Sequence, residues 1–401
     1  MKGEKTLVQE YYRNVVTGSQ MLYFHKPDKD LKMNFKMDPY DKDMDKKIRD
    51  IRLVDAEPAI KILDNGDVRF RYYAPNAKKV EVAGCGGYFS DERQEMTKGE
   101  DGWWSVTVSG IKPGFHNHKY WVDGNLMVNP DAQIGYGWFY PINVFDLPGE
   151  EDGFWMMKDV PHGDVRMELY HSSVTGREKC AWVYTPAGYD DTDKRYPVLY
   201  IQHGVGEDEM GWVWQGHINL IADNLIAEGK MEEMIIVMNC GYAFKDGELP
   251  TFYPGDFDSE LTNNCVPHID AAFRTLSDRK NRAIAGLSLG SSQAFFTAMH
   301  HHVLFASLGV FSGGFPITRA EYDFTDYFND PEQVNKDFDV LFFSGGDDEG
   351  YLVSTDPIVK KEQELGVNVV GYHHPGFHVW DVWRFSAREY LQLLFHENKE
   401  G

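Results

Sequence analysis

The pattern of apolar and polar positions changes its period once along the chain. Between about residue 60 and residue 148, apolar side chains alternate with polar ones, as in Val68, Phe70 and Tyr72 with Arg69 and Arg71 between them. Alternation over short runs, separated by glycine, proline and asparagine, predicts half-buried strands. This region is therefore expected to form a small β-sandwich of the immunoglobulin-like kind.

Beyond residue 149 the apolar positions form continuous runs separated by segments of helical period. Expected buried strands lie at 198–201, 234–238, 283–285, 308–311, 340–343 and 367–372, after an antiparallel pair at 165–171 and 179–184. Helical periods occur at 219–228, 261–275 and 357–365. Buried strands that alternate with helices predict a doubly wound, mostly parallel sheet with helices on both faces. The fold class is thus α/β.

Three parts follow from these patterns. An acidic, turn-rich stretch at residues 146–153 reads as a linker. We therefore expect a β-sandwich domain over 59–148 and an α/β domain over 149–401. Residues 1–58 form an N-terminal arm that is rich in lysine, aspartate and methionine, and its lack of period predicts no defined fold.

Composition narrows the range of partners. The 401 residues include 40 basic and 63 acidic side chains, a net charge of −23, which disfavours nucleic acid and anionic membranes as partners. No apolar run is long enough to cross a bilayer. The polar start lacks the apolar core of a secretory leader, which predicts a cytoplasmic protein, or a secreted one if a leader precedes this sequence. Whether the chain forms a homo-oligomer is left open.

One short stretch carries the candidate nucleophile. The sequence Gly286-Leu287-Ser288-Leu289-Gly290 lies between an apolar strand-like run and a helix-compatible segment. A serine in a Gly-x-Ser-x-Gly turn between strand and helix is the pattern of a nucleophile elbow. The pattern is weak alone, so its weight depends on a base and an acid elsewhere in the chain.

An acid and a histidine follow the serine in chain order. Three acids, Asp347, Asp348 and Glu349, come directly after an expected strand, and His378 lies in a loop before the final helix. The order serine, acid, histidine is that of α/β-hydrolases. We therefore expect Ser288 to attack an ester carbonyl, His378 to act as general base, and one of the acids to orient the histidine.

Backbone N–H groups are the expected oxyanion donors. The glycine-flanked loop His203-Gly204-Val205-Gly206-Glu207 follows the first buried strand, so the N–H groups of Val205 and Leu289 are the candidates. This chemistry uses neither a metal nor another cofactor. The consecutive histidines at 300–302 point in different directions on a helix and are not expected to hold an ion.

Aromatic side chains near the elbow and the histidine loop suit a planar acyl group. The candidate substrate contacts are Trp212 and Trp380, together with Gln293 one turn into the helix after the serine. The alternative for each tryptophan is packing in the core.

The second half resembles a known family. The stretches Val183-Tyr184-Thr185-Pro186, 196–200, 282–288 and 375–384 are similar to the esterase D-like carbohydrate esterases of family one, a group that includes feruloyl and acetyl-xylan esterases. The family places its triad acid in a Gly-x-x-Asp pattern, and counting from Gly346 leads to Glu349, with Asp348 as the fallback. The resemblance implies an α/β-hydrolase that acts on small-molecule or oligosaccharide esters.

The first half has its own resemblance. Residues 70–80, Gly102-Trp103-Trp104, and 119–124 with Asn129-Pro130 are similar to carbohydrate-binding modules of family 48. This implies sugar binding by an exposed aromatic such as Trp103. The alternative, which we favour, is that the tryptophans pack in the core and the domain is structural.

The predicted function is a feruloyl esterase that forms an acyl-enzyme on feruloylated saccharides from plant cell walls. One alternative is an acetyl-xylan or small-acyl esterase or thioesterase that uses the same triad. Another is a glycan-binding protein whose hydrolase domain is inactive.

Overall fold

The computed structural model describes residues 58–84, 90–149, 152–245, 247–249, 255–313, 324–350 and 356–396. The predicted N-terminal arm, up to residue 57, lies outside the described residues. The described chain forms two compact units. The smaller unit comprises residues 58–134 and 142–148, and the larger comprises residues 149–396 together with 135–141.

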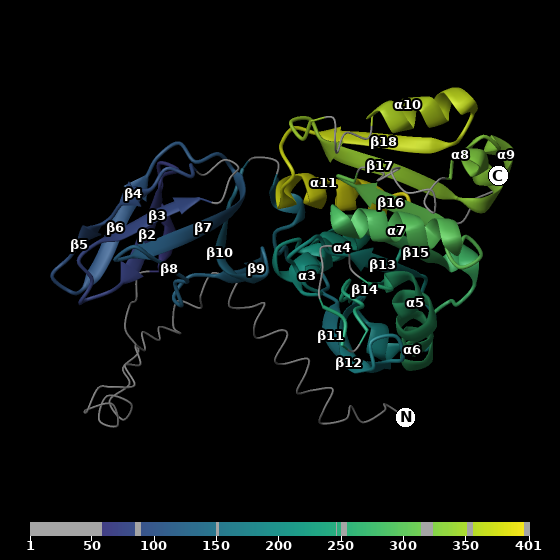
Figure 1. Ribbon diagram of the computed structural model, residues 1–401, viewed down its shortest axis with the longest axis horizontal. Helices are drawn as coiled ribbons and strands as arrows, with labels where there is room; N and C mark the ends of the chain where they lie inside the picture. The colour runs from purple at the N-terminus through teal and green to yellow at the C-terminus, as the bar shows by residue number, and fades with distance from the viewer. Residues whose placement is uncertain are drawn as a thin grey trace. The chain divides into compact units, whose positions relative to one another are not determined.

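Residues 60–147 form two β-sheets (Figure 1). The first sheet has the order β1-β2-β6-β5, and the second has the order β4-β3-β7-β10-β9 with β8 paired to β7. The strands are β1 (Ile60–Ile62), β2 (Val68–Tyr73), β3 (Val80–Gly84), β4 (Gln94–Glu95), β5 (Thr97–Lys98), β6 (Trp103–Val108), β7 (Gly114–Val122), β8 (Asn125–Met127), β9 (Ile134–Gly137) and β10 (Tyr140–Leu147).

The core of this unit lies between the two sheets. On β2 the side chains of Val68, Phe70 and Tyr72 are buried, and they pack with Tyr120 of β7 and Phe145 of β10. The alternating pattern thus gives each strand one buried face, and the predicted β-sandwich is confirmed.

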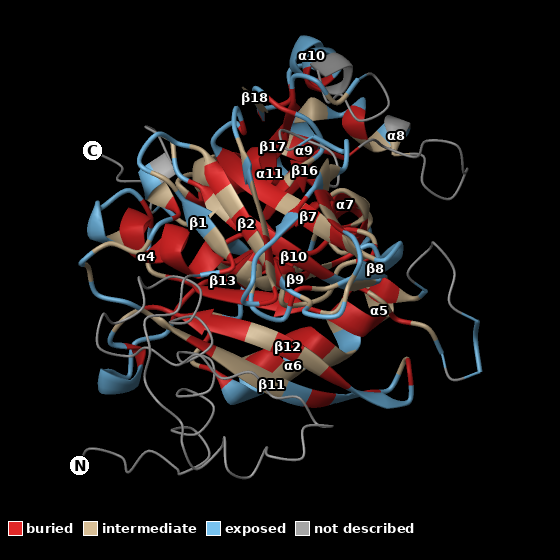
Figure 2. Cartoon of the chain, turned by 90° about the vertical axis from the view of Figure 1, so that its left-hand side faces the viewer, coloured by how far each residue is buried: buried red, intermediate tan, exposed pale blue. Residues whose placement is uncertain are grey.

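The larger unit is organised around one eight-stranded sheet of order β11-β12-β14-β13-β15-β16-β17-β18. Its strands are β11 (Asp164–Ser172), β12 (Arg177–Thr185), β13 (Val198–Gln202), β14 (Ile235–Asn239), β15 (Arg282–Leu287), β16 (Ser307–Phe311), β17 (Val340–Gly346) and β18 (Val369–His374). The pairs β11·β12 and β12·β14 are antiparallel, and the other pairs are parallel. The central strands are buried along their length (Figure 2), as continuous apolar runs predict.

Helices cover both faces of this sheet. The chain forms α3 (Gly211–Trp214), α4 (Ile218–Ala227), α5 (Phe257–Glu260), α6 (Val266–Ala272), α7 (Leu289–His300), α8 (Thr325–Phe328), α9 (Pro331–Asp337), α10 (Asp356–Leu365) and α11 (Trp380–Leu391). Short 3-10 turns lie at Asp152–Phe154, Tyr189–Asp191 and Arg279–Asn281. Side chains of α6, α7, α9 and α10 share one core with the sheet, while Trp212 of α3 and Tyr390 of α11 pack on Phe311. Among the described helices, none has the length and apolarity to span a membrane. The predicted α/β class is confirmed.

One predicted helix differs from the structure. The helical period over 261–275 corresponds to a π-helical turn at Leu261–Cys265 followed by α6, which ends at Ala272. Pro267 lacks an N–H group, so an α-helical bond is missing there, and the wider turn instead directs the N–H of Val266 to the carbonyl of Leu261. Beyond α6 the chain is extended, because Thr275 forms a parallel bridge with Tyr196.

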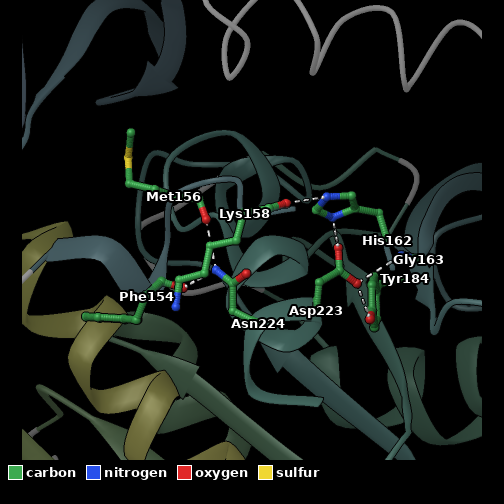
Figure 3. A network of polar contacts seen from close by, with 8 residues as sticks. All are labelled: Phe154, Met156, Lys158, His162, Gly163, Tyr184, Asp223 and Asn224. Carbon is green, nitrogen blue, oxygen red and sulfur yellow. Dashed lines mark hydrogen bonds and ion pairs between the residues drawn. The ribbon is translucent and has the colours of Figure 1, made fainter. Parts of the chain in front are cut away.

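A buried polar network fastens the segment before β11 to α4 (Figure 3). The carboxylate of Asp223 accepts hydrogen bonds from the N–H of Gly163 at 2.9 Å and the hydroxyl of Tyr184 at 2.7 Å, and it contacts Nδ1 of His162 at 2.8 Å. The neighbouring Asn224 donates to the carbonyls of Phe154 and Met156 (Figure 3). Burial raises the pKa of Asp223 despite these bonds.

Removing this carboxylate is expected to destabilise the larger unit. The change Asp223→Ala leaves the N–H of Gly163 and the buried hydroxyl of Tyr184 without their acceptor, which lowers the free energy of unfolding by about 2–4 kcal/mol. Urea unfolding followed by near-ultraviolet circular dichroism, with the transition of the smaller unit fitted separately, measures this. The control His162→Asn alters a side chain that is about one-third exposed, so it should cost less than about 1 kcal/mol. Equal losses of unfolding free energy in the two variants would contradict the stabilising role assigned to the Asp223 carboxylate.

Candidate active site

The predicted nucleophile lies at a sharp turn between β15 and α7. Ser288 has φ 52° and ψ −118°, a backbone conformation that non-glycine residues rarely adopt and that costs about 1–3 kcal/mol. Its N–H donates to the carbonyl of Phe311 at 2.9 Å, which ties the turn to the end of β16. A serine held in this conformation presents its hydroxyl at the carboxyl edge of the sheet.

The two glycines of the motif are required by close packing. A Cβ atom at Gly286 would lie 2.2 Å from the carbonyl oxygen of Gly290, and one at Gly290 would lie 2.3 Å from that of His203. Both contacts are to backbone, so neither position can accept a larger residue without moving the strand or the helix. The turn and the loop after β13 are therefore packed directly against each other.

Glu349 and His378 form a pair at the ends of β17 and β18. Nδ1 of His378 lies 3.3 Å from Oε2 of Glu349, whose side chain is only 1% exposed. The other oxygen, Oε1, accepts hydrogen bonds from the hydroxyl of Ser312 at 2.5 Å and the N–H of Gly346 at 2.9 Å. A carboxylate can only accept, so Nδ1 of His378 carries the donated proton and Nε2 is left as the basic nitrogen.

The other two acids of this loop have different surroundings. Asp347 and Asp348 are exposed, and Asp347 lies 3.5 Å from Nδ1 of His373. The backbone N–H of Asp348 donates to the carbonyl of Gly376. Of the three acids, only Glu349 contacts His378 among the described residues.

A chain of contacts brings Ser288, Glu349 and the predicted oxyanion loop (residues 203–207) together. The N–H of Ser288 bonds to Phe311, and the next residue, Ser312, bonds to Glu349. On the other side, a Cβ atom at Gly204 would lie 3.5 Å from the Cβ of Ser288. The site thus gathers at the carboxyl ends of β13, β15, β16 and β17, where Figure 1 shows these strands side by side.

The loop after β13 leaves one backbone donor available. The N–H of Gly204 donates to Oε2 of Glu207 at 3.0 Å, that of Gly206 to the hydroxyl of Tyr242 at 2.7 Å, and that of Glu207 to the carbonyl of Gly204. No acceptor in the described part of the chain takes the N–H of Val205 or of Leu289. These are the two groups that the sequence predicts as oxyanion donors.

The predicted substrate contacts differ from what the structure shows. Trp212 is 1% exposed and donates its indole N–H to the carbonyl of Gln202, and Trp380 is 3% exposed and packs edge-on against it at 5.1 Å. Gln293 is also buried, and its amide donates to the carbonyl of Gly241 at 2.7 Å. The two indole rings pack against each other between α3 and α11, so they have almost no surface left for a ligand.

Several residues that the sequence analysis missed contact these loops. Ser312, Tyr242 and Glu207 hold the acid and the loop after β13 from separate strand ends. Glu207 lies in the predicted oxyanion loop, but the sequence gives its side chain no role. Trp138 and Phe139, which belong to the larger unit, are about 60% exposed with φ 57° and 66°. The N–H of Phe139 donates to the carbonyl of Gly206 at 2.9 Å. The sequence around Trp138 and Phe139 does not predict that they lie near this loop, because their position depends on the contact with Gly206, which is distant in the sequence.

The histidine run takes part in no metal cluster. Nδ1 of His300 lies 2.7 Å from Oδ2 of Asp258, and His301 lies 3.6 Å from the same oxygen. In the described ranges no group of three or more histidine, cysteine or acidic side chains has the geometry to hold an ion.

The two tryptophans of the smaller unit have different roles. Trp104 is buried and donates its indole N–H to the carbonyl of Ala74 at 2.9 Å. Trp103 is half-buried, with the guanidinium of Arg71 4.2 Å from its ring centre and Tyr73 beside it at 5.4 Å. The rings of this unit are thus divided between the core and a partly exposed cation–π stack.

A sharp serine turn, a His–carboxylate pair and a parallel sheet that carries both at one edge define an α/β-hydrolase. The chain belongs to the Esterase family, whose model matches residues 172–386. A second model, carbohydrate-binding module 48 (isoamylase N-terminal domain), matches residues 56–132.

Relatives of this chain include proteins named as esterases. An endo-1,4-beta-xylanase/feruloyl esterase of Xylanibacter ruminicola is 35% identical over 305 residues, which cover 72% of this chain and 42% of that protein. The chain thus spans less than half the length of this relative. Esterase Rv1288 of Mycobacterium tuberculosis is 29% identical over 172 residues, which are 41% of this chain and 36% of that protein.

Solved structures share the fold. A ferulic acid esterase of Anaeromyces mucronatus matches with a TM-score of 0.51 and 24% identity, over 61% of this chain and 95% of that one. The enterochelin esterase of Shigella flexneri matches with a TM-score of 0.60 and 13% identity, over 84% of this chain and 94% of that one. At these identities the likeness establishes the α/β-hydrolase fold.

Proposed function

We propose that this protein is a feruloyl esterase that releases hydroxycinnamic acids from feruloylated saccharides through a serine-bound acyl-enzyme. The observation that carries the proposal is the 35% identity to the xylanase/feruloyl esterase of Xylanibacter ruminicola, over most of this chain. The match to a carbohydrate-binding module in residues 56–132 supports a saccharide as the alcohol part of the ester.

The proposed mechanism uses the residues of the candidate site in two half-reactions. Oγ of Ser288 attacks the ester carbonyl while Nε2 of His378 takes its proton, and Glu349 stabilises the imidazolium that forms. The N–H groups of Val205 and Leu289 bind the oxyanion, each contributing roughly 3–4 kcal/mol. The intermediate collapses as His378 returns the proton to the sugar oxygen, which leaves as the alcohol. Water then attacks the acyl-enzyme by the same route and releases the carboxylic acid.

The acyl group is tested by comparing two substrates. A feruloyl esterase is expected to hydrolyse methyl ferulate with a kcat/KM at least about 10-fold above that of an aliphatic methyl ester, since an aromatic acyl group contributes additional binding energy. Release of ferulate from feruloylated arabinoxylo-oligosaccharides, measured by chromatography, tests the saccharide part. Hydrolysis of p-nitrophenyl acetate without hydrolysis of methyl ferulate would replace the proposal with an acetyl or small-acyl esterase.

A further inference from the structure

Glu207 is a partly buried carboxylate at the end of the loop that follows β13. Its Oε2 accepts the N–H of Gly204 at 3.0 Å. Its Oε1 accepts the indole N–H of Trp380 at 2.9 Å and the amide of Gln215 at 3.3 Å. The two oxygens of one side chain therefore connect the loop after β13 to the first residue of α11, two residues after His378.

The loop around Val205 is held from both sides. Glu207 takes the N–H of Gly204 before it, and the hydroxyl of Tyr242 takes the N–H of Gly206 after it. The orientation of the intervening peptide plane, and so the direction of the Val205 N–H, depends on these two acceptors. Nδ1 of His203 adds a third bond by donating to the carbonyl of Gly204 at 2.8 Å.

Keeping a carboxylate at this position opposes folding. Burial raises the pKa of Glu207 from 4.5 to about 7, although hydrogen bonds from Gly204 and Trp380 and the nearby His203 lower it in part, and Asp208 raises it further. The folded state therefore holds this proton more tightly than the unfolded state. Stability from this group is present at low pH and is lost as the pH rises from 4.5 through about 7. A residue that opposes folding at neutral pH is a candidate for a functional role.

We propose that Glu207 is a positioning residue that holds the Gly204–Gly206 turn so that the Val205 N–H points at the oxyanion, and that couples this turn to the helix following the catalytic histidine. The proposal rests on the proposed serine mechanism and is independent of the acyl group. It requires two acceptor oxygens, because one faces Gly204 and the other faces Trp380.

The test replaces this carboxylate with its isosteric amide. In Glu207→Gln one side-chain oxygen becomes an NH2 group, which places a donor against either Gly204 or Trp380. We expect kcat/KM for p-nitrophenyl acetate to fall about 10- to 100-fold, with most of the change in kcat, because one oxyanion donor is misaligned. The rate of phosphonylation by a fluorophosphonate should fall in parallel. Stability at pH 8 should not decrease, since no buried charge remains.

A matched control and a second variant complete the experiment. Asp223→Asn makes the same carboxylate-to-amide change in a buried network whose hydrogen bonds, within the described part of the chain, do not reach the active-site loops, and it should keep kcat/KM within about 2-fold. Tyr242→Phe removes the acceptor on the other side of the loop and should lower kcat/KM in the same direction, by about 3- to 30-fold.

The pH profile provides a readout that a structural role would not change. Protonation of Glu207 makes one of its oxygens a donor, so log kcat/KM of the wild type should show an inflection near pH 7 that Glu207→Gln lacks.

Two outcomes would overturn the proposal. Wild-type kcat/KM and an unchanged pH profile in Glu207→Gln would remove the positioning role. Loss of activity in proportion to the unfolded fraction would make Glu207 a structural residue only. Failure of methyl ferulate as a substrate leaves this test intact, since p-nitrophenyl acetate reports the same oxyanion loop.

Discussion

Replacing Ser288 with alanine is expected to lower kcat for ester hydrolysis by about 10⁴- to 10⁶-fold, the range seen when a triad nucleophile is removed. Without Oγ no acyl-enzyme forms, and only binding and the oxyanion donors remain to assist attack by water. Initial rates with p-nitrophenyl acetate and methyl ferulate measure the loss. The variant should also fail to react with a fluorophosphonate.

The control for Ser288→Ala is a measurement of its thermal stability. Alanine occupies the same strained backbone conformation as serine, so the unfolding midpoint of Ser288→Ala should match the wild type within a few degrees. Hydrolysis within about 10-fold of the wild type would contradict the role of Ser288 and would require another nucleophile at the site.

Replacing Glu349 with glutamine is expected to lower kcat by about 10³- to 10⁴-fold. The side chain keeps its size, but an amide cannot stabilise the imidazolium, and its NH2 group can turn His378 into the wrong tautomer. The loss should appear in kcat with little change in KM, because the residue acts on the transition state through the histidine.

A neighbouring acid supplies the matched control. Asp348→Asn changes an exposed carboxylate one residue away, whose described contacts do not include His378, so its kcat should remain within about 2-fold of the wild type. A large loss in Asp348→Asn with a small loss in Glu349→Gln would transfer the role of triad acid to Asp348.

Much of the fold is predictable because its signals are local. The alternation on β2 and the continuous apolar runs of β13 and β15 follow from which faces each strand buries. The elbow around Ser288 is also local, since the strain of the turn and the clearance between Gly286 and Gly290 concern neighbouring residues. The π-helical turn before α6 was missed, because its apolar period resembles that of an α-helix.

The choice of Glu349 as the acid of the site could not be made from the local sequence pattern. Three consecutive acids follow β17, and only the resemblance to a family selected Glu349 among them. In the structure the distinction lies in burial and in contacts: Glu349 turns inward to Ser312, while Asp347 and Asp348 face solvent. A charge pattern contains no information about which of three neighbours is buried.

By itself, the sequence determined the α/β class, the sandwich before it, and the positions of Ser288 and His378 on their loops. Only the tertiary structure decided which side chains support those loops. Trp212 and Trp380 pack with each other instead of facing a ligand, and Glu207 and Tyr242 hold the two sides of Val205. These contacts join segments up to 173 positions apart, as between Glu207 and Trp380. Their geometry depends on which strands are neighbours in the sheet, and the periodicity along the chain does not specify that order.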